Sequence, residues 1–245
     1  MAQAHRPSSA TPAGSRLYAV GDIHGRADLL EALLEQIEAD AARHPQPAKR
    51  LIYLGDYVDR GPASSAVIDL VLHNGPPGIE VVPLMGNHEE MMLRFLEDIA
   101  VARTWMMNGG DATLLSYGVE PPSMFAGTPR LLQAQQQFAE RLPARHRSFL
   151  QGLATSRAEG DYLFVHAGVR PGVALDRQRT EDLLWIRDEF LDSDWDFGKV
   201  VVHGHSISLD PEFRPNRIGI DTGAYRSGQL TCLVLDGAER TLLTT

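Results

Sequence analysis

The chain has 245 residues, of which 43% are hydrophobic and 22% are charged, and its formal net charge at pH 7 is −9. This length can bury a full core, and no apolar run approaches the ~20 residues that a membrane-spanning helix needs. The acidic balance argues against a broad basic surface for nucleic acid, so any bound anion must be captured locally. We therefore expect a soluble protein that binds neither membranes nor nucleic acid.

The beginning of the chain and its single cysteine indicate the cellular setting. Residues 1–16 are rich in Ala, Ser, Pro and Gly and lack the apolar core of a secretory signal, which predicts a disordered tail before one domain over 17–245. Cys232 cannot form an internal disulfide, and its apolar surroundings predict a buried thiol without a catalytic role. Both features favour a cytoplasmic location.

Seven short apolar runs rich in Val, Ile, Leu and Tyr predict strands. They lie at 17–21, 51–55, 80–85, 162–166, 199–203, 217–221 and 230–235. Between the first three runs, residues 27–37 and 63–72 carry apolar residues at helical spacing. This alternation predicts parallel pairing, and ligands collect at the carboxyl ends of the strands in such sheets.

The remaining segments complete the predicted fold. Residues 108–160 are rich in Gln, Arg, Leu and Ala and are broken by prolines, which predicts a helical insertion beside the site. Short links with turn residues join the last three apolar runs and favour an antiparallel second sheet. We predict an α/β fold in which two sheets pack face to face with helices outside them, as α-β-β-α layers.

Metal-competent side chains follow five of these predicted strands. The sequences GDIHG, GDYVDRG and GNHE occupy residues 21–25, 55–61 and 86–89, while His166 and the HGH at 203–205 end two later strands. One such turn alone is usually only a turn, but six such residues at five strand ends are hard to assign to core packing. Carboxylate, amide and imidazole groups are ligands of two-metal sites that cleave phosphoesters.

The spacing of these residues suggests how cations could be shared. Asp22 and His24 are two residues apart, so in an extended segment both side chains reach one cation. Asp56 could bridge two cations with its two oxygens. Asn87 and His88 are adjacent and point to different sides of an extended turn, so one can bind metal while the other faces the substrate.

Asp59, Arg60 and Arg187 each have a structural and a catalytic interpretation. Asp59 and Arg60 could form a surface ion pair, which contributes only ~0–1 kcal/mol, and Arg187 could be an ordinary surface residue. Beside two cations the catalytic interpretation is favoured, because arginine donates paired hydrogen bonds to phosphoryl oxygens. His88 could protonate a departing alkoxide if Asp59 fixes its tautomer, a role worth ~10²–10⁴-fold in rate.

These motifs, with VHAG at 165–168 and HGHS at 203–206, resemble the signature of the calcineurin-like metallophosphoesterases. Within that superfamily they are most similar to the phosphoprotein phosphatase branch, in particular the lambda-phosphatase-like bacterial and phage enzymes. Segments 105–110, 184–187 and 220–224 support this resemblance, which runs from about residue 17 to 237.

The resemblance implies a role for each residue of the motifs. One metal would be held by Asp22, His24 and Asp56, and the other by Asp56, Asn87, His166 and His205. His88 would be the general acid, oriented by Asp59, while Arg60 and Arg187 would bind the phosphoryl oxygens. His203 would be a gate or a support for the ligands, because its position in the family is often occupied by arginine or another residue.

The leading functional hypothesis is a manganese-dependent phosphatase. It would hydrolyse phosphoserine and phosphothreonine, and also phosphotyrosine, in a phosphoprotein or phosphopeptide through in-line attack of a hydroxide that bridges two metals. Two cations beside Asp22 and Asp56 leave roughly two positive charges, which suits a phosphomonoester dianion. Mixed Asp, Asn and His ligands also admit Fe, Zn, Co or Ni.

Two alternatives stay open. A diadenosine tetraphosphatase would share the fold and the metals, but that branch has Ala at the position of Asp59 and Asp at the position of Glu89, so both differences favour the protein phosphatase. A non-catalytic metal-bound scaffold could recognise phosphate or a partner through residues 108–160. Such degenerate relatives normally lose a ligand or the acid, and none is missing from this sequence.

Overall fold

The structure is a computed structural model that describes residues 9–73 and 75–245. In this part of the chain, two five-stranded sheets have the strand orders β10-β9-β1-β2-β3 and β4-β5-β6-β8-β7. The first sheet contains β1 (Ser15–Val20), β2 (Ala48–Tyr53), β3 (Glu80–Pro83), β9 (Thr231–Asp236) and β10 (Glu239–Thr244). The second contains β4 (Ser156–Glu159), β5 (Tyr162–Val165), β6 (Val200–His203), β7 (Glu212–Phe213) and β8 (Arg217–Gly219).

Each sheet combines three parallel strands with two antiparallel strands. Strands β1, β2 and β3 are parallel, as are β5, β6 and β8. Strands β9 and β10 continue the first sheet antiparallel, while β4 and β7 are antiparallel edges of the second. Parallel neighbours end at the same edge of their sheet, so the loops that follow them can meet.

Alternation along the strands explains why the sheets stack. Successive side chains of a strand point to opposite faces. Leu17 and Ala19 of β1 lie in the core between the two sheets, whereas Tyr18 and Val20 lie in the core outside the first sheet. Both faces of β1 are therefore buried, as expected for a strand in the middle of layered sheets.

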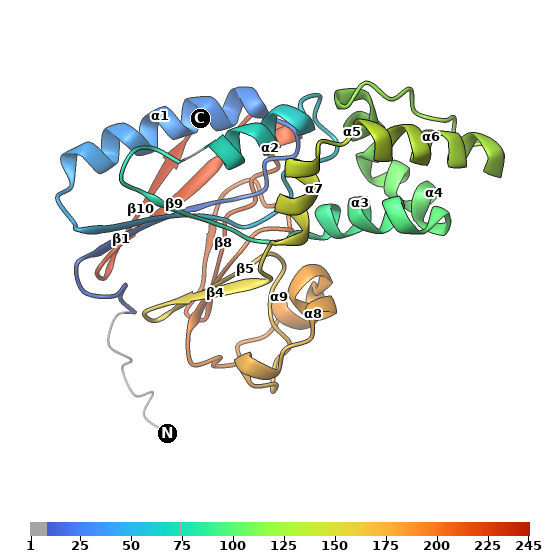
Figure 1. The fold of residues 1–245 in the computed structure, drawn as a ribbon. Helices are drawn as coiled ribbons and strands as arrows, with labels where there is room; N and C mark the ends of the chain where they lie inside the picture. Colours follow the sequence, from blue (N-terminus) through green and yellow to red (C-terminus); the bar gives the residue numbers. More distant parts are fainter. Residues whose placement is uncertain (1–8, 74) are drawn as a thin grey trace.

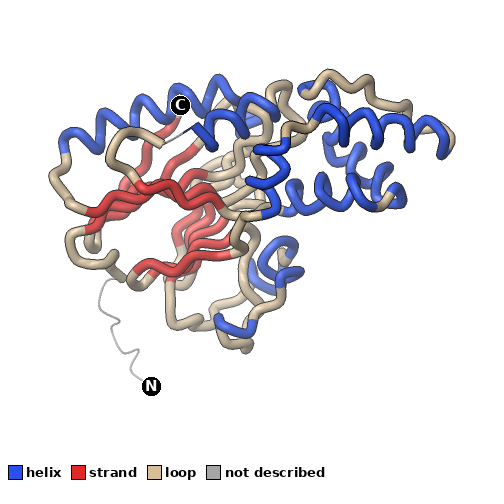
Figure 2. The backbone as a smooth tube through the Cα atoms, viewed as in Figure 1, coloured by secondary structure: helices blue, strands red, loops and turns tan. Residues whose placement is uncertain are grey.

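Helices cover the outer face of each sheet, as Figures 1 and 2 show. Helices α1 (Ala27–Arg43) and α2 (Ser64–His73) lie over the first sheet, and α1 buries Leu30, Leu33 and Ile37 at helical spacing. Helices α8 (Thr180–Trp185) and α9 (Asp188–Leu191) contribute to a core outside the second sheet. The predicted α-β-β-α layering is confirmed.

Five further helices gather at one end of the sheets (Figure 1). They are α3 (Asn87–Glu97), α4 (Ala102–Trp105), α5 (Asp111–Ser116), α6 (Thr128–Arg141) and α7 (Ala144–Gln151). The helical region therefore begins at Asn87, before the predicted insertion at 108–160, and it ends at Gln151, before residue 160. The last residues of the predicted insertion form strand β4 instead. The sequence of β4, SRAE, lacks an apolar run, because β4 is an edge strand and most of its residues are not fully buried.

The prediction of an antiparallel second sheet from the last three apolar runs was wrong. Strands β6 and β8 are parallel, and β9 joins the first sheet beside β1. A parallel pair needs a crossover of about a dozen residues, and residues 204–216 supply that length. Leu233 and Leu235 of β9 then fill the space between the sheets.

Strand β1 begins earlier than the apolar run predicted at 17–21. Residues 1–8 of the expected tail lie outside the described residues, but Ser15 and Arg16 are buried and belong to β1. Within the described residues, no helix has the length and apolar character needed to span a membrane. Cys232 is a free, buried thiol, as predicted.

Candidate metal centre

The predicted ligands lie on loops that leave the carboxyl ends of parallel strands from both sheets. Asp22 and His24 follow β1, Asp56 follows β2, and Asn87 begins α3 after β3. His166 and His205 follow β5 and β6 of the second sheet. All six side chains are buried, and the structure brings them together at one edge of the sandwich.

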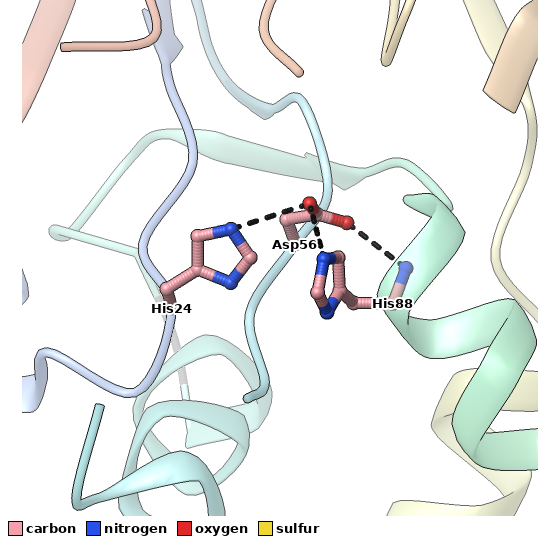
Figure 3. Close-up of side chains that lie close together, drawn as sticks. All are labelled: His24, Asp56 and His88. Atoms are coloured by element: carbon pink, nitrogen blue, oxygen red, sulfur yellow. Dashed lines mark hydrogen bonds and ion pairs between the residues drawn. The ribbon is translucent and has the colours of Figure 1, made fainter. Parts of the chain in front are cut away.

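Asp56 stands between two groups of imidazoles. In the first group, the Asp56 Oδ2 atom lies 3.4 Å from His24 Nε2 and 3.7 Å from His88 Nε2. Figure 3 shows the two rings on either side of this carboxylate. In the second group, Asp56 Oδ1 lies 3.4 Å from His166 Nε2, and that nitrogen lies 3.2 Å from His205 Nδ1. The two Asp56 oxygens thus face different groups, as a bridging carboxylate would.

The histidine tautomers leave lone pairs directed into these groups. His24 Nδ1 lies 2.8 Å from the Val58 carbonyl and His166 Nδ1 lies 2.9 Å from the Leu54 carbonyl, so each Nδ1 carries the hydrogen and donates it. Each Nε2 is then an acceptor. A second hydrogen bond of this kind is typical of histidines that bind metal.

Several acceptor atoms converge on His166 Nε2, and their spacing indicates whether a cation fits between them. The Asn87 Oδ1 atom lies 2.8 Å from this nitrogen, closer than two lone pairs tolerate without a positive charge between them. Burial lowers the pKa of His166, so a proton is disfavoured there. The His205 Nε2 atom is also buried without a hydrogen-bond partner among the described residues. These residues fit a divalent cation.

The ionisation of the surrounding groups agrees with that fit. Burial would raise the pKa of Asp56, but His166, His88 and His24 hold it well below its usual range. Burial, with His166 nearby, lowers the pKa of His205 to about 2. A neutral imidazole beside an ionised carboxylate is the state in which these groups bind a metal.

Asp22 belongs to neither group of three. Its carboxylate accepts hydrogen bonds from the His205 backbone N–H at 3.0 and 3.2 Å, and burial together with the charges of Asp221 and Asp56 raises its pKa well above its usual range. A Cβ atom at position 204 would overlap Asp22 Oδ1, so a larger residue there would displace this carboxylate. Asp22 therefore lies in an acidic cluster, and a bound cation would reduce the repulsion between its carboxylates.

His88 forms a buried pair with Asp59. The His88 Nδ1 atom lies 2.7 Å from Asp59 Oδ2, and Asp59 also accepts hydrogen bonds from Trp105 Nε1 at 2.9 Å and Thr113 Oγ1 at 2.6 Å. Burial would lower the pKa of His88, but Asp56 and Asp59 raise it. The imidazole is thus held in one orientation and favours carrying a proton.

Glu89 organises the loop that carries Asp56. Its buried carboxylate accepts hydrogen bonds from the backbone N–H groups of Asp56 and Tyr57, each at 2.8 Å, from Val58 at 3.2 Å and from Gly86 at 3.0 Å. Burial, reinforced by the charge of Asp56, raises the pKa of Glu89 to about 8. One side chain thus ties the loop after β2 to the start of α3.

The two arginines occupy different environments. The Arg60 guanidinium nitrogens lie 2.8 Å from His24 Nε2 and 3.0 Å from His88 Nε2, so Arg60 lies within the site. Arg187 is exposed and lines a surface hollow of about 460 Å³ beside Trp185, whose ring lies 6.3 Å from that of His205. The Arg187 charge contributes to lowering the pKa of His205.

His203 contacts neither group. It packs against Phe190, a residue of the core outside the second sheet, at 5.0 Å between ring centroids, and its Nε2 atom lies 3.4 Å from Arg217. Burial lowers the pKa of His203 to about 4.

Several residues that support the site could not be predicted from the sequence. Trp105 and Asp221 lie in segments that resemble the family, but the motifs indicate no role for them. Asp221 is buried beside Asp22, and its Oδ2 atom has no hydrogen-bond partner among the described residues. Thr113 lies in a helix that gives no motif, so nothing in the sequence pointed to its hydrogen bond with Asp59.

Comparison with known proteins agrees with this arrangement. Residues 15–226 match the calcineurin-like phosphoesterase family. The chain belongs to that family. The resemblance carried by the motifs is confirmed, and the protein is a metallophosphoesterase whose His and Asp groups could bind two metal ions.

Members of the calcineurin-like phosphoesterase family with different substrates are similar to this chain. The symmetrical bis(5'-nucleosyl)-tetraphosphatase of Dechloromonas aromatica (strain RCB) is 33% identical over 162 residues, which cover 66% of this chain and 47% of that protein. The chain thus spans about half the length of that relative. Serine/threonine-protein phosphatase 2 of Escherichia coli (strain K12) is 28% identical over 224 residues, covering 88% of this chain and 90% of the relative.

A solved structure supports the fold. A crystal structure provisionally assigned as a diadenosine tetraphosphatase superimposes with a TM-score of 0.64 over 96% of this chain and 95% of that chain, at 21% sequence identity. At this identity the likeness concerns the fold alone.

Proposed function

We propose that this metallophosphoesterase hydrolyses phosphomonoesters of alcohols, with phosphoserine and phosphothreonine in proteins as its substrates. The observation that carries this proposal is the buried pair of His88 and Asp59, with 2.7 Å between Nδ1 and Oδ2. An alkoxide is a strong base and needs a proton as it departs, whereas a departing nucleotide phosphate is a much weaker base. A built proton donor therefore favours an ester with a poor leaving group.

The proposed metal ligands are those implied by the motifs. Asp22, His24 and Asp56 would hold one divalent cation, and Asp56, Asn87, His166 and His205 would hold the other. When bound, two such cations supply positive charge for the phosphoryl oxygens and the Lewis acidity that makes water nucleophilic near neutral pH. Manganese is the proposed metal, and elemental analysis of protein purified without added metal tests that choice.

The protein's own residues would position the substrate and move the proton. Asp59 holds the Nδ1–H of His88, so Nε2 is the atom left to deliver a proton to the departing oxygen. Arg60 carries a fork of donors within reach of the same site and would bind phosphoryl oxygens as His88 acts. Arg187 would approach the phosphoryl group from the exposed hollow beside Trp185.

A dinucleoside tetraphosphatase is the second candidate. The observation that favours it is the similarity to the Dechloromonas aromatica tetraphosphatase, which covers residues in two thirds of this chain. The Escherichia coli protein phosphatase covers more of the chain at lower identity. Sequence similarity therefore supports both substrates, and the proton donor favours the phosphomonoester.

A substrate comparison tests the proposal. The manganese-loaded protein would be assayed with a phosphoserine peptide, diadenosine tetraphosphate and an aryl phosphate. We expect kcat/KM for the peptide to exceed that for the dinucleotide at least ~10-fold, which is about 1.4 kcal/mol of transition-state discrimination. Faster cleavage of the dinucleotide would establish the second candidate, and absence of all three activities would favour the non-catalytic scaffold.

A further inference from the structure

Arg60 is fixed at its backbone end. Its φ angle is +69°, in the left-handed region, and its N–H donates to the Gly109 carbonyl at 3.1 Å. A Cβ atom added at Gly109 would lie 2.6 Å from the Arg60 nitrogen, so the close approach depends on glycine. The link between α4 and α5 thus holds the start of the Arg60 side chain.

The guanidinium end of Arg60 has no carboxylate partner among the described residues within ion-pair distance. Instead, the guanidinium carbon lies over the ring of Tyr225, 4.9 Å from its centroid. The same ring makes an edge contact with His24 at 5.4 Å between centroids. Tyr225 therefore touches both the arginine and one of the imidazoles that the arginine reaches.

Tyr225 is itself held in place. It lies in α10 (Ala224–Ser227), which follows Gly223, and the Ala224 carbonyl accepts a hydrogen bond from Arg26 at 3.0 Å. The ring is partly buried. The short helix can present the ring to Arg60 only while the helix keeps its own position, and this hydrogen bond helps to keep it there.

An aromatic partner suits an arginine that must bind an anion. A carboxylate would orient the guanidinium but would also neutralise its charge and compete for its N–H donors. A ring attracts the cation through its π face and leaves the in-plane donors free. We infer that Tyr225 is a positioning residue, which holds Arg60 ready to bind the phosphoryl group without neutralising it. This inference rests on the proposed role of Arg60 in phosphoryl binding.

A double-mutant cycle on the manganese-loaded protein tests this inference. Inorganic phosphate is the probe, with its affinity measured by calorimetry and as the inhibition constant against aryl phosphate hydrolysis. We expect Tyr225→Leu to weaken phosphate binding ~2–30-fold and to raise KM more than it lowers kcat. Tyr225→Phe should keep the affinity within ~2-fold, because the ring remains. In an Arg60→Ala background, Tyr225→Leu should have no further effect.

Two results would overturn the inference. An equal loss from Tyr225→Leu with and without Arg60 would show that the ring does not act through the arginine. An equal loss in the Phe and Leu variants would assign the effect to the hydroxyl group. Circular dichroism and metal content verify that each variant is folded and loaded.

The experiments distinguish a failure of this inference from a failure of the proposed function. If the wild-type protein cleaves no phosphomonoester, the proposed function fails, while calorimetry with phosphate still measures the coupling between Tyr225 and Arg60. If the wild-type protein is an active phosphatase and the cycle shows no coupling, the inference alone fails.

Discussion

Backbone strain is concentrated in the residues of the candidate site. Among the described residues, the non-glycine residues with φ in the left-handed region are His24, Asp56, Asp59, Arg60 and His205. Such conformations cost ~1–3 kcal/mol each and persist only where surrounding contacts enforce them. The four N–H groups that donate to Glu89 show one source of that enforcement. The backbone conformations of the candidate site residues thus reduce the stability of the folded state.

The role of His88 can be separated from that of the metals. We expect His88→Asn to reduce turnover of an alkyl phosphate ~10²-fold or more while metal content stays near normal, because the proton donor is lost and the proposed ligands remain. An aryl phosphate with a good leaving group should lose less activity, since it needs less protonation. Steady-state kinetics with both esters and elemental analysis provide the measurement. Unchanged turnover of the alkyl ester would remove His88 from the mechanism.

At the scale of elements, a buried polar network joins α1 to the first sheet away from the site. Asp40 of α1 accepts hydrogen bonds from Arg16 Nε at 2.9 Å and Tyr18 Oη at 2.8 Å, and Arg16 also pairs with Asp236 of β9 at 2.8 Å. Burial would raise the pKa of Asp40, but the hydrogen bonds from Tyr18 and Arg16 outweigh it and lower the pKa. Arg16 of β1 is therefore linked to α1 through Asp40 and to β9 through Asp236.

This network predicts a pH dependence of stability. Because the pKa of Asp40 is lower in the folded state, its contribution is complete above its unfolded pKa of about 3.9 and is lost as pH falls through the folded value. Asp40→Asn should reduce the free energy of unfolding at pH 7 by about 1–3 kcal/mol and make the loss of stability below about pH 4 smaller.

Urea unfolding at pH 7 and pH 3 measures this effect. Glu38→Gln is the matched control, because Glu38 is an exposed carboxylate on the same helix, and it should change stability little at either pH. Equal effects of the two substitutions at pH 7 would contradict the assigned role of Asp40.

At the scale of the whole molecule, the candidate metal centre joins the two sheets. Asp22, Asp56 and Asn87 come from loops of the first sheet, whereas His166 and His205 come from loops of the second. Their acceptor atoms converge, so without a cation the edges of the sheets repel each other locally. Metal binding should therefore stabilise the packing of one sheet on the other.

Metal removal should lower the thermal stability of the whole fold. A ligand at 100 times its Kd stabilises the folded state by about 2.7 kcal/mol. For a chain of this size each kcal/mol shifts Tm by about 2–4 °C, so chelation should lower Tm by about 5–11 °C relative to manganese-loaded protein. Calorimetry with a chelator and with added manganese measures the difference, and Asn87→Ala should reduce it. The same Tm in both conditions would contradict the predicted centre.

The layered fold could be predicted because its signals are local. Apolar runs separated by helical segments indicate parallel strands, and the residues after each run, from Asp22 to His205, then have to meet at one edge. The assignment of β9 to the first sheet could not be predicted, because the partner of an apolar strand depends on which surface remains uncovered. Strand β4 escaped detection because an edge strand needs no continuous apolar run.

The kind of chemistry could be predicted from the sequence, since residue types at strand ends specify which groups can converge on cations and which family the chain resembles. The arrangement of those groups depends on the tertiary structure. That structure placed His203 away from the site, enclosed Asp59 between Trp105 and Thr113, and set Arg60 against Tyr225. Motifs record short-range spacing, whereas these contacts join residues far apart in the chain and depend on how the layers pack.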